Sequence, residues 1–511
     1  MLYKETPFTG YCIALASGII CSSYLHSAIY CHTALLIVLV LLVTAGILHR
    51  KRISSISYGL TLHACIFLLG CSLAIINSKS PGLLQPGHRE FVLITDDYPS
   101  PTSRSLKLHT SIIKSDAAEY GRKNKMVLYT DGRYISPSLA PGSIIRLVTE
   151  PLEISDFNPD DDFDYRAFMN RRGFRYYTFC YDSIAVIDEK PGIRHLGLRL
   201  RKNLLSRLRK NMDDEKSLAI VSAMCLGYRE LLDDDIKDVF RKSGIMHIMA
   251  VSGLHVGIVS MLILTLLKIT RIRSGFVKLL ISLILIWTYA LVTGLSPSVI
   301  RASIMFSFLN TGYLINRQVK PINSVMASAF LVLVIKPDMI YEASFLLSYS
   351  AVILIVVNYR KMVSLLNFRG RILSYVWRMI VISLLAQAGT IPFVALFFGK
   401  IPLLSLVSNL FAIPLATIIL LSGFAMVLFA STPFIPLFLA KILVYSVSTL
   451  SEAAAAVASL DMVVAGTGAL SPARAVTLFL LLAVSTCYLL DRERSNPHMP
   501  LTIMILYFLI P

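Results

Sequence analysis

Two histidines and a serine lie where a long apolar segment begins, in the stretch from His247 to Gly257. Polar groups at membrane depth are costly unless they face protein or water, so they are candidates for function. Ser252 and His255 are three residues apart, a spacing that would suit the nucleophile and base of an intramembrane hydrolase. Gly253 and Gly257 would permit a helix break or a close backbone approach. Zinc binding is not expected, because the eight-residue separation of the two histidines is poor for chelation from one helix.

The same stretch admits two interpretations besides hydrolysis. Its polar groups could be satisfied by hydrogen bonds inside a helix bundle, or they could line a hydrated passage. The sequence offers no evident oxyanion-hole partner for Ser252, and the hydrolase also requires the serine and histidine side chains to meet.

A second interruption of apolar sequence runs from Gly294 to Ser303. Pro297 fits the first turn of a new helix, which places Arg301 about one turn inside that helix. A cation at this depth requires a polar cavity, lipid headgroups or an acidic partner. Glu342 is one candidate for the counter-ion.

Two further polar sites follow. One is a kinked site with Gln387 and Pro392, where we expect a helix to break near 387–392, and the other is at Asn409. Broken helices also occur in secondary transporters, whose substrates bind near the membrane midplane. A transporter of a small or lipid-linked solute is therefore an alternative, although we find no convincing internal repeat.

The composition indicates that these sites belong to a polytopic α-helical membrane protein. Of the 511 residues, 55% are hydrophobic and only 16% are charged, and the mean hydropathy is +0.67. Soluble domains are about 45–50% apolar and about 25% charged, so a cytosolic enzyme, a disordered scaffold and a disulfide-stapled secreted domain are excluded. The net charge of +18 first suggests basic cytoplasmic loops, although it is also compatible with a polyanionic cargo.

Apolar stretches of spanning length occur on both sides of a more polar block. The first three cover 10–30, 33–49 and 56–77, and the later ones cover 245–268, 276–294, 298–315, 322–335, 340–358, 373–391, 402–430, 434–457 and 471–490. The basic run from His49 to Arg52 predicts a cytoplasmic N-terminus and an extracytoplasmic block. The predicted organisation is N-terminal transmembrane helices at 1–79, a β domain at 80–190, basic interfacial helices at 191–243, a transmembrane domain at 244–491 and a tail at 492–511.

Residues 80–190 have the pattern of a small inserted β domain. Five β-rich runs are separated by turn signals such as Asp131-Gly132 and Pro141-Gly142. Five strands fit an OB-like barrel, a fold used for nucleic acids and oligosaccharides, but they fit other small barrels equally well. The block holds 14 Lys and Arg against 16 Asp and Glu, so it is not basic overall.

The segment 191–210 carries seven Lys and Arg and no acid, with leucines at roughly helical spacing. This pattern is typical of a helix lying on a membrane interface, and phosphate-backbone binding is the alternative. A second amphipathic helix is expected from Asp213 to about Lys242.

Several segments also match a known family in order. They are Leu226–Glu230, leading through Arg241–His247 to Ala250–Gly257, then Thr293–Ala302, Phe345–Ser348, Ala386–Pro392 and Asn409–Pro414. These segments resemble the ComEC competence proteins, the inner-membrane DNA-uptake channels. Upstream, Asp156–Pro159, Phe163–Arg166 and Arg171–Gly173 resemble the end of the family's extracytoplasmic OB-like domain. The resemblance extends over about residues 10–490.

The resemblance implies a non-enzymatic channel that carries single-stranded DNA across the bacterial inner membrane during natural transformation. The implied motif residues of the channel are His247, Ser252, Gly253, His255, Gly257, Pro297, Arg301, Glu342, Gln387, Pro392 and Asn409. The DNA contacts that we expect are Arg171, Arg172, Arg175, Arg201, Lys202 and Arg301. The implied partners are single-stranded DNA, the lipid bilayer, an extracytoplasmic DNA receptor and a cytoplasmic motor or single-strand-binding protein, with a homo-oligomer as one arrangement; no cofactor or metal is expected.

Two positions depart from the family pattern. Tyr228 stands where the family usually has an acid, and Leu346 stands where it usually has glutamine. The chain resembles a short form without the metallo-β-lactamase-like domain of longer members, because it contains no His-x-His-x-Asp-His cluster. It also contains no Gly-x-x-x-x-Gly-Lys-Ser/Thr phosphate loop, so we expect the energy for pulling DNA to come from a partner or from the proton gradient.

Overall fold

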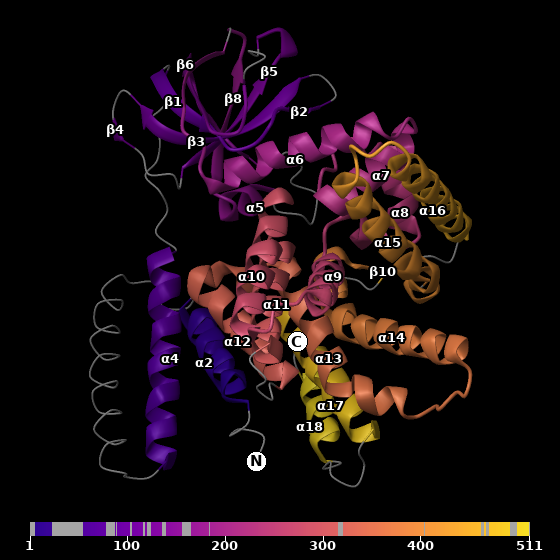
Figure 1. Cartoon of the computed structure of the whole chain (residues 1–511). Coiled ribbons are helices and arrows are strands. Elements are labelled where there is room, and N and C mark those ends of the chain that lie inside the picture. The colour runs from indigo at the N-terminus through magenta and orange to yellow at the C-terminus, as the bar shows by residue number, and fades with distance from the viewer. Residues whose placement is uncertain are drawn as a thin grey trace.

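The structure is a computed structural model that is mostly helical, with a β domain inserted near its N-terminus (Figure 1). It describes residues 6–22, 55–77, 87, 89–102, 105–115, 118–119, 124–134, 139–155, 165–182, 184–314, 320–402, 404–460, 464–466, 470–490 and 498–509. The predicted span at 33–49 and the basic run His49–Arg52 lie outside these residues.

The N-terminal helices α2 (Pro7–Ser22) and α4 (Ser55–Asn77) lie side by side. Gly18 explains how closely they approach. A Cβ at this position would lie 2.0 Å from the carbonyl oxygen of Phe67, so a larger residue would force the two helices apart.

The β domain is built around one twisted sheet, in which β7-β8-β5-β3-β1-β6-β9 is the order of the main path. Its strands are β1 (Arg89–Thr95), β2 (Ser100–Pro101), β3 (Leu106–Ser115), β4 (Ala118–Glu119), β5 (Lys125–Thr130), β6 (Ser143–Thr149), β7 (Leu152–Glu153), β8 (Phe174–Cys180) and β9 (Ala185–Glu189). Buried and more exposed residues alternate along β8, so one face of this strand lines a core with Phe91, Leu108, Met126 and Ile145.

The predicted OB-like barrel is not closed. The five long strands pair in the order β8-β5-β3-β1-β6, with β5 and β8 parallel, and this is the neighbour order of a five-stranded barrel before closure. Closure would also need a ladder between β6 and β8, and the described residues contain none. Instead the two strands meet through a hydrogen bond between the hydroxyls of Thr149 and Thr178. The structure therefore confirms a β-sheet domain, but it does not confirm a closed barrel.

Helix α5 (Tyr165–Arg171) lies within this domain, between β7 and β8. Three helices then lead from the domain to the rest of the molecule: α6 (Ile193–Lys210), α7 (Glu215–Leu226) and α8 (Asp234–Lys242). The expected single helix from 213 to 242 is wrong, because Gly227 ends α7 in the left-handed conformation at φ +70°. Helix α7 is also not amphipathic, since every residue from Ser217 to Leu226 is buried.

The remaining helices are α9 (Gly253–Ile269), α10 (Gly275–Val292), α11 (Pro297–Leu314), α12 (Pro321–Ile335), α13 (Ala343–Val363), α14 (Arg371–Phe398), α15 (Ser405–Leu428), α16 (Ile435–Ala458), α17 (Pro472–Leu490) and α18 (His498–Leu509). Short 3₁₀ turns lie at Gly132–Tyr134 (η1), Met246–Met249 (η2) and Pro337–Tyr341 (η3), and β10 (Lys400–Pro402) pairs with β11 (Val464–Gly466).

Within the described residues, seven helices are long and apolar enough to cross a membrane. They are α4, α10, α13, α14, α15, α16 and α17, each of which coincides with a predicted apolar stretch. The structure also contains the predicted interruptions before α9 and before α11. The expected break at 387–392 is wrong, because α14 continues through Pro392 to Phe398.

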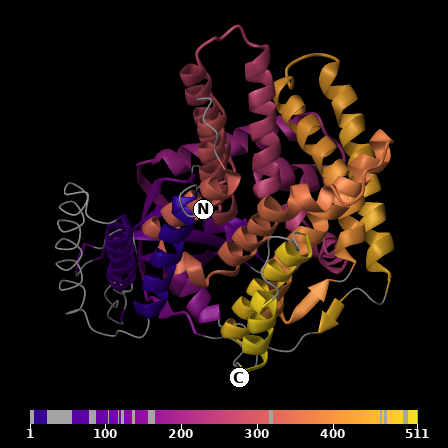
Figure 2. The same ribbon diagram turned by 90° about the horizontal axis from the view of Figure 1, so that it is seen from below.

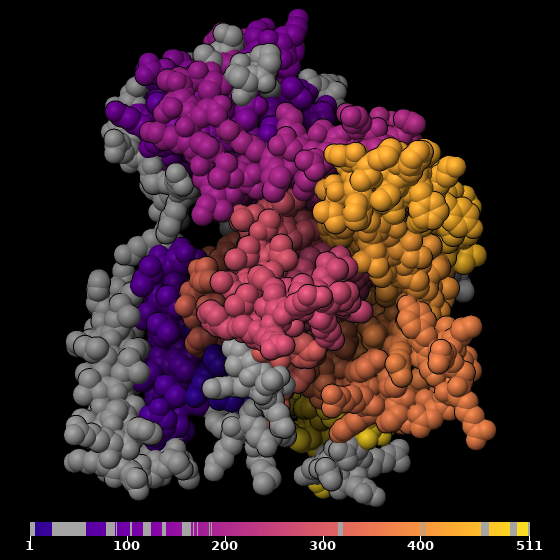
Figure 3. Space-filling view, in the orientation of Figure 1, coloured from indigo at the N-terminus to yellow at the C-terminus, as the bar shows by residue number. Residues whose placement is uncertain are grey.

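The β domain and α6 form one end of the molecule, and the apolar helices extend away from them (Figures 1 and 3). Helix α7 packs against α15 and α16, which lie side by side at one edge of the view in Figure 2. A second core joins α2 to α11, α12 and α13, and a third joins α9, α10 and α11.

Candidate functional site

The stretch that contains both histidines is not α-helical until Gly253. Residues Met246–Met249 form η2, Ala250 and Ser252 are extended, and α9 begins directly afterwards. His247 is exposed and Ser252 is partly exposed, whereas His255 is completely buried. The polar side chains of this segment therefore differ in their access to solvent.

Ser252 and His255 do meet, as the hydrolase interpretation requires. The hydroxyl of Ser252 lies 2.9 Å from Nδ1 of His255, and the backbone N–H of Ser252 donates to the same nitrogen at 3.3 Å. A nitrogen that accepts this bond leaves the ring proton on Nε2. That atom is buried and has no hydrogen-bond partner among the described residues. The contact therefore caps α9, and it also places a potential base beside a hydroxyl.

Three of the motif segments meet at Gly227, where α7 ends. A Cβ on this glycine would lie 3.1 Å from the carbonyl oxygen of Thr293 and 3.4 Å from the side chain of Val251. Thr293 lies at the end of α10, and Val251 lies just before the start of α9. Helix ends carry backbone groups that have no partner within the helix, so three sets of polar backbone groups gather at this point. We call it the three-way junction.

The interruption between α10 and α11 is a tight reversal next to this junction. Gly294 has φ +84° and Leu295 has φ +55°, so two consecutive residues are left-handed. Leucine pays a steric cost in this conformation, whereas glycine does not. Pro297 then begins α11, as the sequence predicts.

Arg301 is buried in the helix bundle and is only 1% exposed. Its guanidinium donates to the hydroxyls of Ser298 and Ser344, both at 3.3 Å, and its Nε has no hydrogen-bond partner within the described part of the chain. The proposed counter-ion Glu342 does not pair with it directly. Glu342 accepts from Ser344 at 3.3 Å and forms an ion pair with Lys336 at 3.1 Å. The role of Arg301 as a phosphate-facing cation stays a prediction.

The later motif residues lie around the start of α15. The amide of Gln387 on α14 donates to the hydroxyl of Ser405. Ser408 donates to the carbonyl oxygen of Ser243 at 2.7 Å, which ties α15 to the chain just before η2. The carbonyl oxygen of the neighbouring Asn409 side chain is buried and lacks a hydrogen-bond partner among the described residues. The structure thus places Asn409 one residue from a contact with Ser243, which precedes the stretch that holds the histidines.

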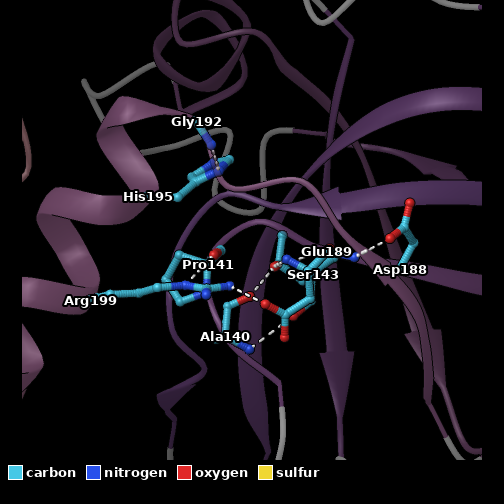
Figure 4. Close-up of polar contacts among 9 residues, drawn as sticks. Ala140, Pro141, Ser143, Asp188, Glu189, Gly192, His195 and Arg199 are labelled. Atoms are coloured by element: carbon cyan, nitrogen blue, oxygen red, sulfur yellow. Dashed lines mark hydrogen bonds and ion pairs between the residues drawn. The ribbon is translucent and has the colours of Figure 1, made fainter.

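Helix α6 contacts both the β domain and the apolar helix α10. Figure 4 shows the polar contacts on the side of the β domain. Arg199 donates to the carbonyl oxygen of Pro141 at 3.1 Å and pairs with Glu189 at 2.8 Å. Near the start of the helix, Nδ1 of His195 accepts from the backbone of Gly192 at 3.1 Å. On the opposite side, a Cβ at Gly197 would lie 2.6 Å from the carbonyl oxygen of Leu291 on α10.

Two of the expected DNA contacts lie on α6 and already have partners in the protein. The side chain of Arg201 is 9% exposed, pairs with Asp97 at 3.3 Å and lies 5.6 Å from the centre of the Tyr228 ring. Lys202 is exposed and lies 4.5 Å from the centre of the Tyr98 ring. DNA contact by either residue stays a prediction.

Tyr228, the first departure from the family pattern, therefore lies with its ring beneath the guanidinium of Arg201 and next to the three-way junction. Burial raises the pKa of Tyr228 above its ordinary value, and burial also raises the pKa of the neighbouring Glu230. Leu346, the second departure, is partly buried against the core that joins α2 to α13.

The β domain exposes a row of aromatic rings that sequence reasoning missed. The ring of Phe179 lies 5.5 Å from Tyr129, 5.8 Å from Tyr177 and 6.5 Å from Tyr181, with the last pair nearly parallel at 12°. Phe179 is 48% exposed and Tyr181 is 72% exposed. The alternation of aromatic residues along 175–181 is the only sequence signal that could have indicated this row.

Cations lie beside these rings. Arg175 occupies the same face of β8 as Tyr177 and Phe179, because residues two apart on a strand point the same way. Lys107 of β3 is opposite Tyr129 in the sheet, and burial together with nearby Arg172 lowers the pKa of Lys107. The guanidinium carbon of Arg172 lies 4.1 Å from the centre of the Phe168 ring. The side chain of Arg171 lies outside the described part of the structure.

No group of three or more His, Cys, Asp or Glu residues that could hold a metal ion occurs in the described ranges. The contacts described above support polar contact and proton exchange at Ser252 and His255, with stacking and charge pairing on the β domain.

Comparison with known proteins gives one family and several relatives. The sequence pattern of the Competence protein family matches residues 224–492. The chain is similar to "ComE operon protein 3" of Bacillus subtilis (strain 168), with 25% identity over 360 residues, which cover 68% of this chain and 43% of that protein. It is also similar to "Recombination protein 2" of Haemophilus influenzae (24% identity, 43% of this chain and 29% of that protein).

A third relative is an "Uncharacterized protein" of Aquifex aeolicus, with 29% identity over 40% of this chain and 46% of that protein. The matches thus span less than half the length of each of these three relatives. No solved structure matches the chain.

Proposed function

The chain belongs to the Competence protein family, of ComEC type, and on this premise we propose that it serves DNA uptake as a channel for single-stranded DNA. The observation that carries the proposal is the three-way junction, where α7, α9 and α10 begin or end around Gly227. Broken helices expose polar backbone groups inside an apolar bundle, and transporters use such groups to bind charged cargo. A DNA strand needs such polar groups along its path, together with tolerance of every base.

The aromatic row on the β domain supports the same proposal. Exposed rings stack on any base, and single-stranded DNA presents its bases to such rings. In this proposal Tyr129, Phe179 and Tyr181 hold bases while Arg175 and Lys107 face phosphates. The domain contains both features even though its net charge is slightly negative.

The surroundings that this function requires are part of the proposal. The seven apolar helices would lie in the bacterial inner membrane, with the β domain on the extracytoplasmic side. A DNA receptor would deliver the strand there, and a motor or single-strand-binding protein would receive it in the cytoplasm. Two or more copies could assemble around one path.

The test uses the full chain reconstituted in vesicles that contain a trapped DNA-binding dye. A single-stranded oligothymidylate is added outside, and external nuclease then removes what has not entered. We expect dye-bound DNA inside, and we expect Gly227→Ala to lower its amount severalfold, because the new Cβ would press on Thr293. Gly399→Ala is the matched control, since Gly399 also has positive φ but nothing within 4 Å of its Cβ position.

Transport of small solutes by vesicles that exclude the oligonucleotide would overturn the channel and indicate a solute transporter. An equal loss of DNA flux in both glycine variants would overturn the role of the three-way junction, because it would attribute the effect to backbone strain alone. Phe179→Ala with Tyr181→Ala tests the aromatic row separately, with Ile187→Ala on β9 as an exposed control.

The contact of 2.9 Å between Ser252 and His255 favours one other function, an intramembrane hydrolase. A fluorophosphonate probe distinguishes it, because an activated serine is labelled and a capping serine is not. Labelling that disappears in Ser252→Ala, combined with unchanged DNA entry in that variant, would support the hydrolase. An unlabelled protein would exclude this role for Ser252.

A further inference from the structure

A surface groove runs between α9 and α11 and continues to the start of α10. Its first part has a volume of about 650 Å³ and extends from Gly257 to Lys268 along α9, opposite Phe306 and Tyr313 of α11. An adjoining part of about 600 Å³ shares Leu264, Lys268 and Tyr313 with it and ends among residues 273–278. The two parts therefore form one continuous groove.

The walls of the groove are apolar and face outward. Met261 is 72% exposed and Phe276 is 69% exposed, and Leu264, Phe306 and Leu309 line the space between them. Helix α10 is long and apolar enough to cross a membrane, and α9 is a shorter apolar helix, so in a bilayer their exposed apolar side chains would meet lipid chains. The groove thus offers an apolar channel to a lipid chain.

The mouth of the groove is cationic. Lys268, Arg273 and Lys278 line it, and none of the lining residues is acidic. None of these three cations forms an ion pair in the part of the chain that the structure describes. The ammonium of Lys268 lies 5.8 Å from the centre of the Tyr313 ring, which holds one cation at the rim. An anion at the mouth would meet three positive charges and no competing carboxylate.

The floor of the groove is a fixed polar contact among three helices. The amide of Asn310 on α11 donates to Ser282 of α10 at 2.8 Å and to Ser260 of α9 at 3.1 Å. All three side chains are at most 3% exposed. Because these bonds hold α9, α10 and α11 together, the groove is a built feature of the fold.

We propose that this groove binds an anionic phospholipid. An acyl chain lies along Met261, Leu264 and Phe306, and the phosphate group lies among Lys268, Arg273 and Lys278. Basic pockets between transmembrane helices on the cytoplasmic side recognise anionic headgroups in this way. The alternation of basic loops predicts that side for this end of α9. A DNA strand fits less well, because it would expose its phosphates to the apolar walls.

The experiment measures lipid binding to the full, delipidated chain in detergent by native mass spectrometry. Phosphatidylglycerol and phosphatidylcholine with the same acyl chains are titrated separately. We expect phosphatidylglycerol to bind at least tenfold more tightly, because each basic residue near an anionic headgroup contributes about fivefold in affinity.

Two variants separate the two halves of the site. The triple variant Lys268→Gln, Arg273→Gln, Lys278→Gln should lose the preference for phosphatidylglycerol. The matched control is Arg360→Gln, Arg369→Gln, Arg371→Gln, three exposed cations near the ends of α13 and α14 that do not line the groove, and it should keep the preference. Thr265→Trp fills the apolar part, leaves every cation in place and should weaken binding of both lipids.

Several results would overturn the proposal. Equal affinity for the two lipids in the wild-type chain, or an unchanged preference in the triple variant, would remove the headgroup site. Displacement of the lipid by inorganic phosphate, with no effect of Thr265→Trp, would indicate a site for free phosphate. Displacement by oligothymidylate would assign the groove to nucleic acid. If the triple variant does not fold, the wild-type preference and the Thr265→Trp result decide.

Discussion

The ion pair between Arg201 and Asp97 offers the sharpest test of how the β domain is attached. The two side chains are 9% and 28% exposed and 3.3 Å apart, so the pair is mostly shielded from water. Loss of one partner from a buried pair costs about 3–5 kcal/mol, because the other charge is left uncompensated. For Asp97→Asn, which strands the more buried guanidinium, we expect about 3 kcal/mol.

The reverse substitution, Arg201→Met, should cost less in electrostatic free energy. It leaves Asp97, which is 28% exposed, where water can solvate it. It also removes the contact with the Tyr228 ring at 5.6 Å, worth about 0.5–2 kcal/mol. The double variant should cost less than the sum of the two, with a coupling free energy of about 1–3 kcal/mol.

The assay is hydrogen exchange of the full chain in detergent, read on peptides that cover 89–102 and 193–210. It reports the free energy of local opening at the attachment without requiring reversible global unfolding. Coupling below about 0.5 kcal/mol would refute the reasoning, because it would mean that the pair does not hold the two parts together.

A parallel measurement tests the alternative role of Arg201 in DNA binding. Removing one cation that touches a phosphate of single-stranded DNA should reduce the slope of log affinity against log salt concentration by about 0.7. Since the guanidinium is 9% exposed, we expect Arg201→Met to leave this slope unchanged. A reduced slope with unchanged hydrogen exchange would assign Arg201 to DNA instead.

Three further perturbations test other parts of the fold. Burial lowers the pKa of His109 to about 4 from its ordinary value of 6.5, so the unfolded β domain binds the proton first as the pH falls. The contribution of His109 to stability is complete above pH 6.5 and is lost towards pH 4, by up to about 3 kcal/mol. Hydrogen exchange of 106–115 against pH checks this, and a His109→Gln variant with the same pH dependence would contradict it. Gly142→Ala should loosen the start of α6 by about 1–3 kcal/mol, because φ is +90° and the new Cβ would lie 2.7 Å from the backbone of Pro191; unchanged exchange at 193–210 would be the contrary result. Gly423→Ala should lower the thermal midpoint, because its Cβ would lie 2.5 Å from the sulfur of Cys225, and adding Cys225→Ala should restore it. Failure of that rescue would mean that Gly423 is required for another reason.

The apolar helices were predictable because each one coincides with a single continuous apolar stretch of the sequence. The stretch predicted at 276–294 became α10 at 275–292, and 434–457 became α16 at 435–458. The end of α7 was missed because glycine is tolerated in many helices, and only the left-handed φ of Gly227 shows that it terminates this one.

Side-chain partners were much harder to predict than helices. Ser252 and His255 are near in sequence, so their contact could be anticipated. Arg201 and Asp97 are 104 residues apart, and a run of cations on α6 gives no sign that one of them is buried against a distant acid. The same is true of Asn310, whose partners come from two other helices. Such pairs depend on tertiary packing, which local patterns do not encode.

The burial of α7 from Ser217 to Leu226 has a consequence for how the chain is made. Its residue Cys225 packs against Ile419 of α15, which is 194 positions later in the chain. At about 5–20 residues per second, synthesis takes about 10–40 s to cover that separation. During this interval the apolar surface of α7 has neither α15 nor α16 to cover it. Cells that make this protein must therefore shelter a completed helix while the second half of the chain is still being translated.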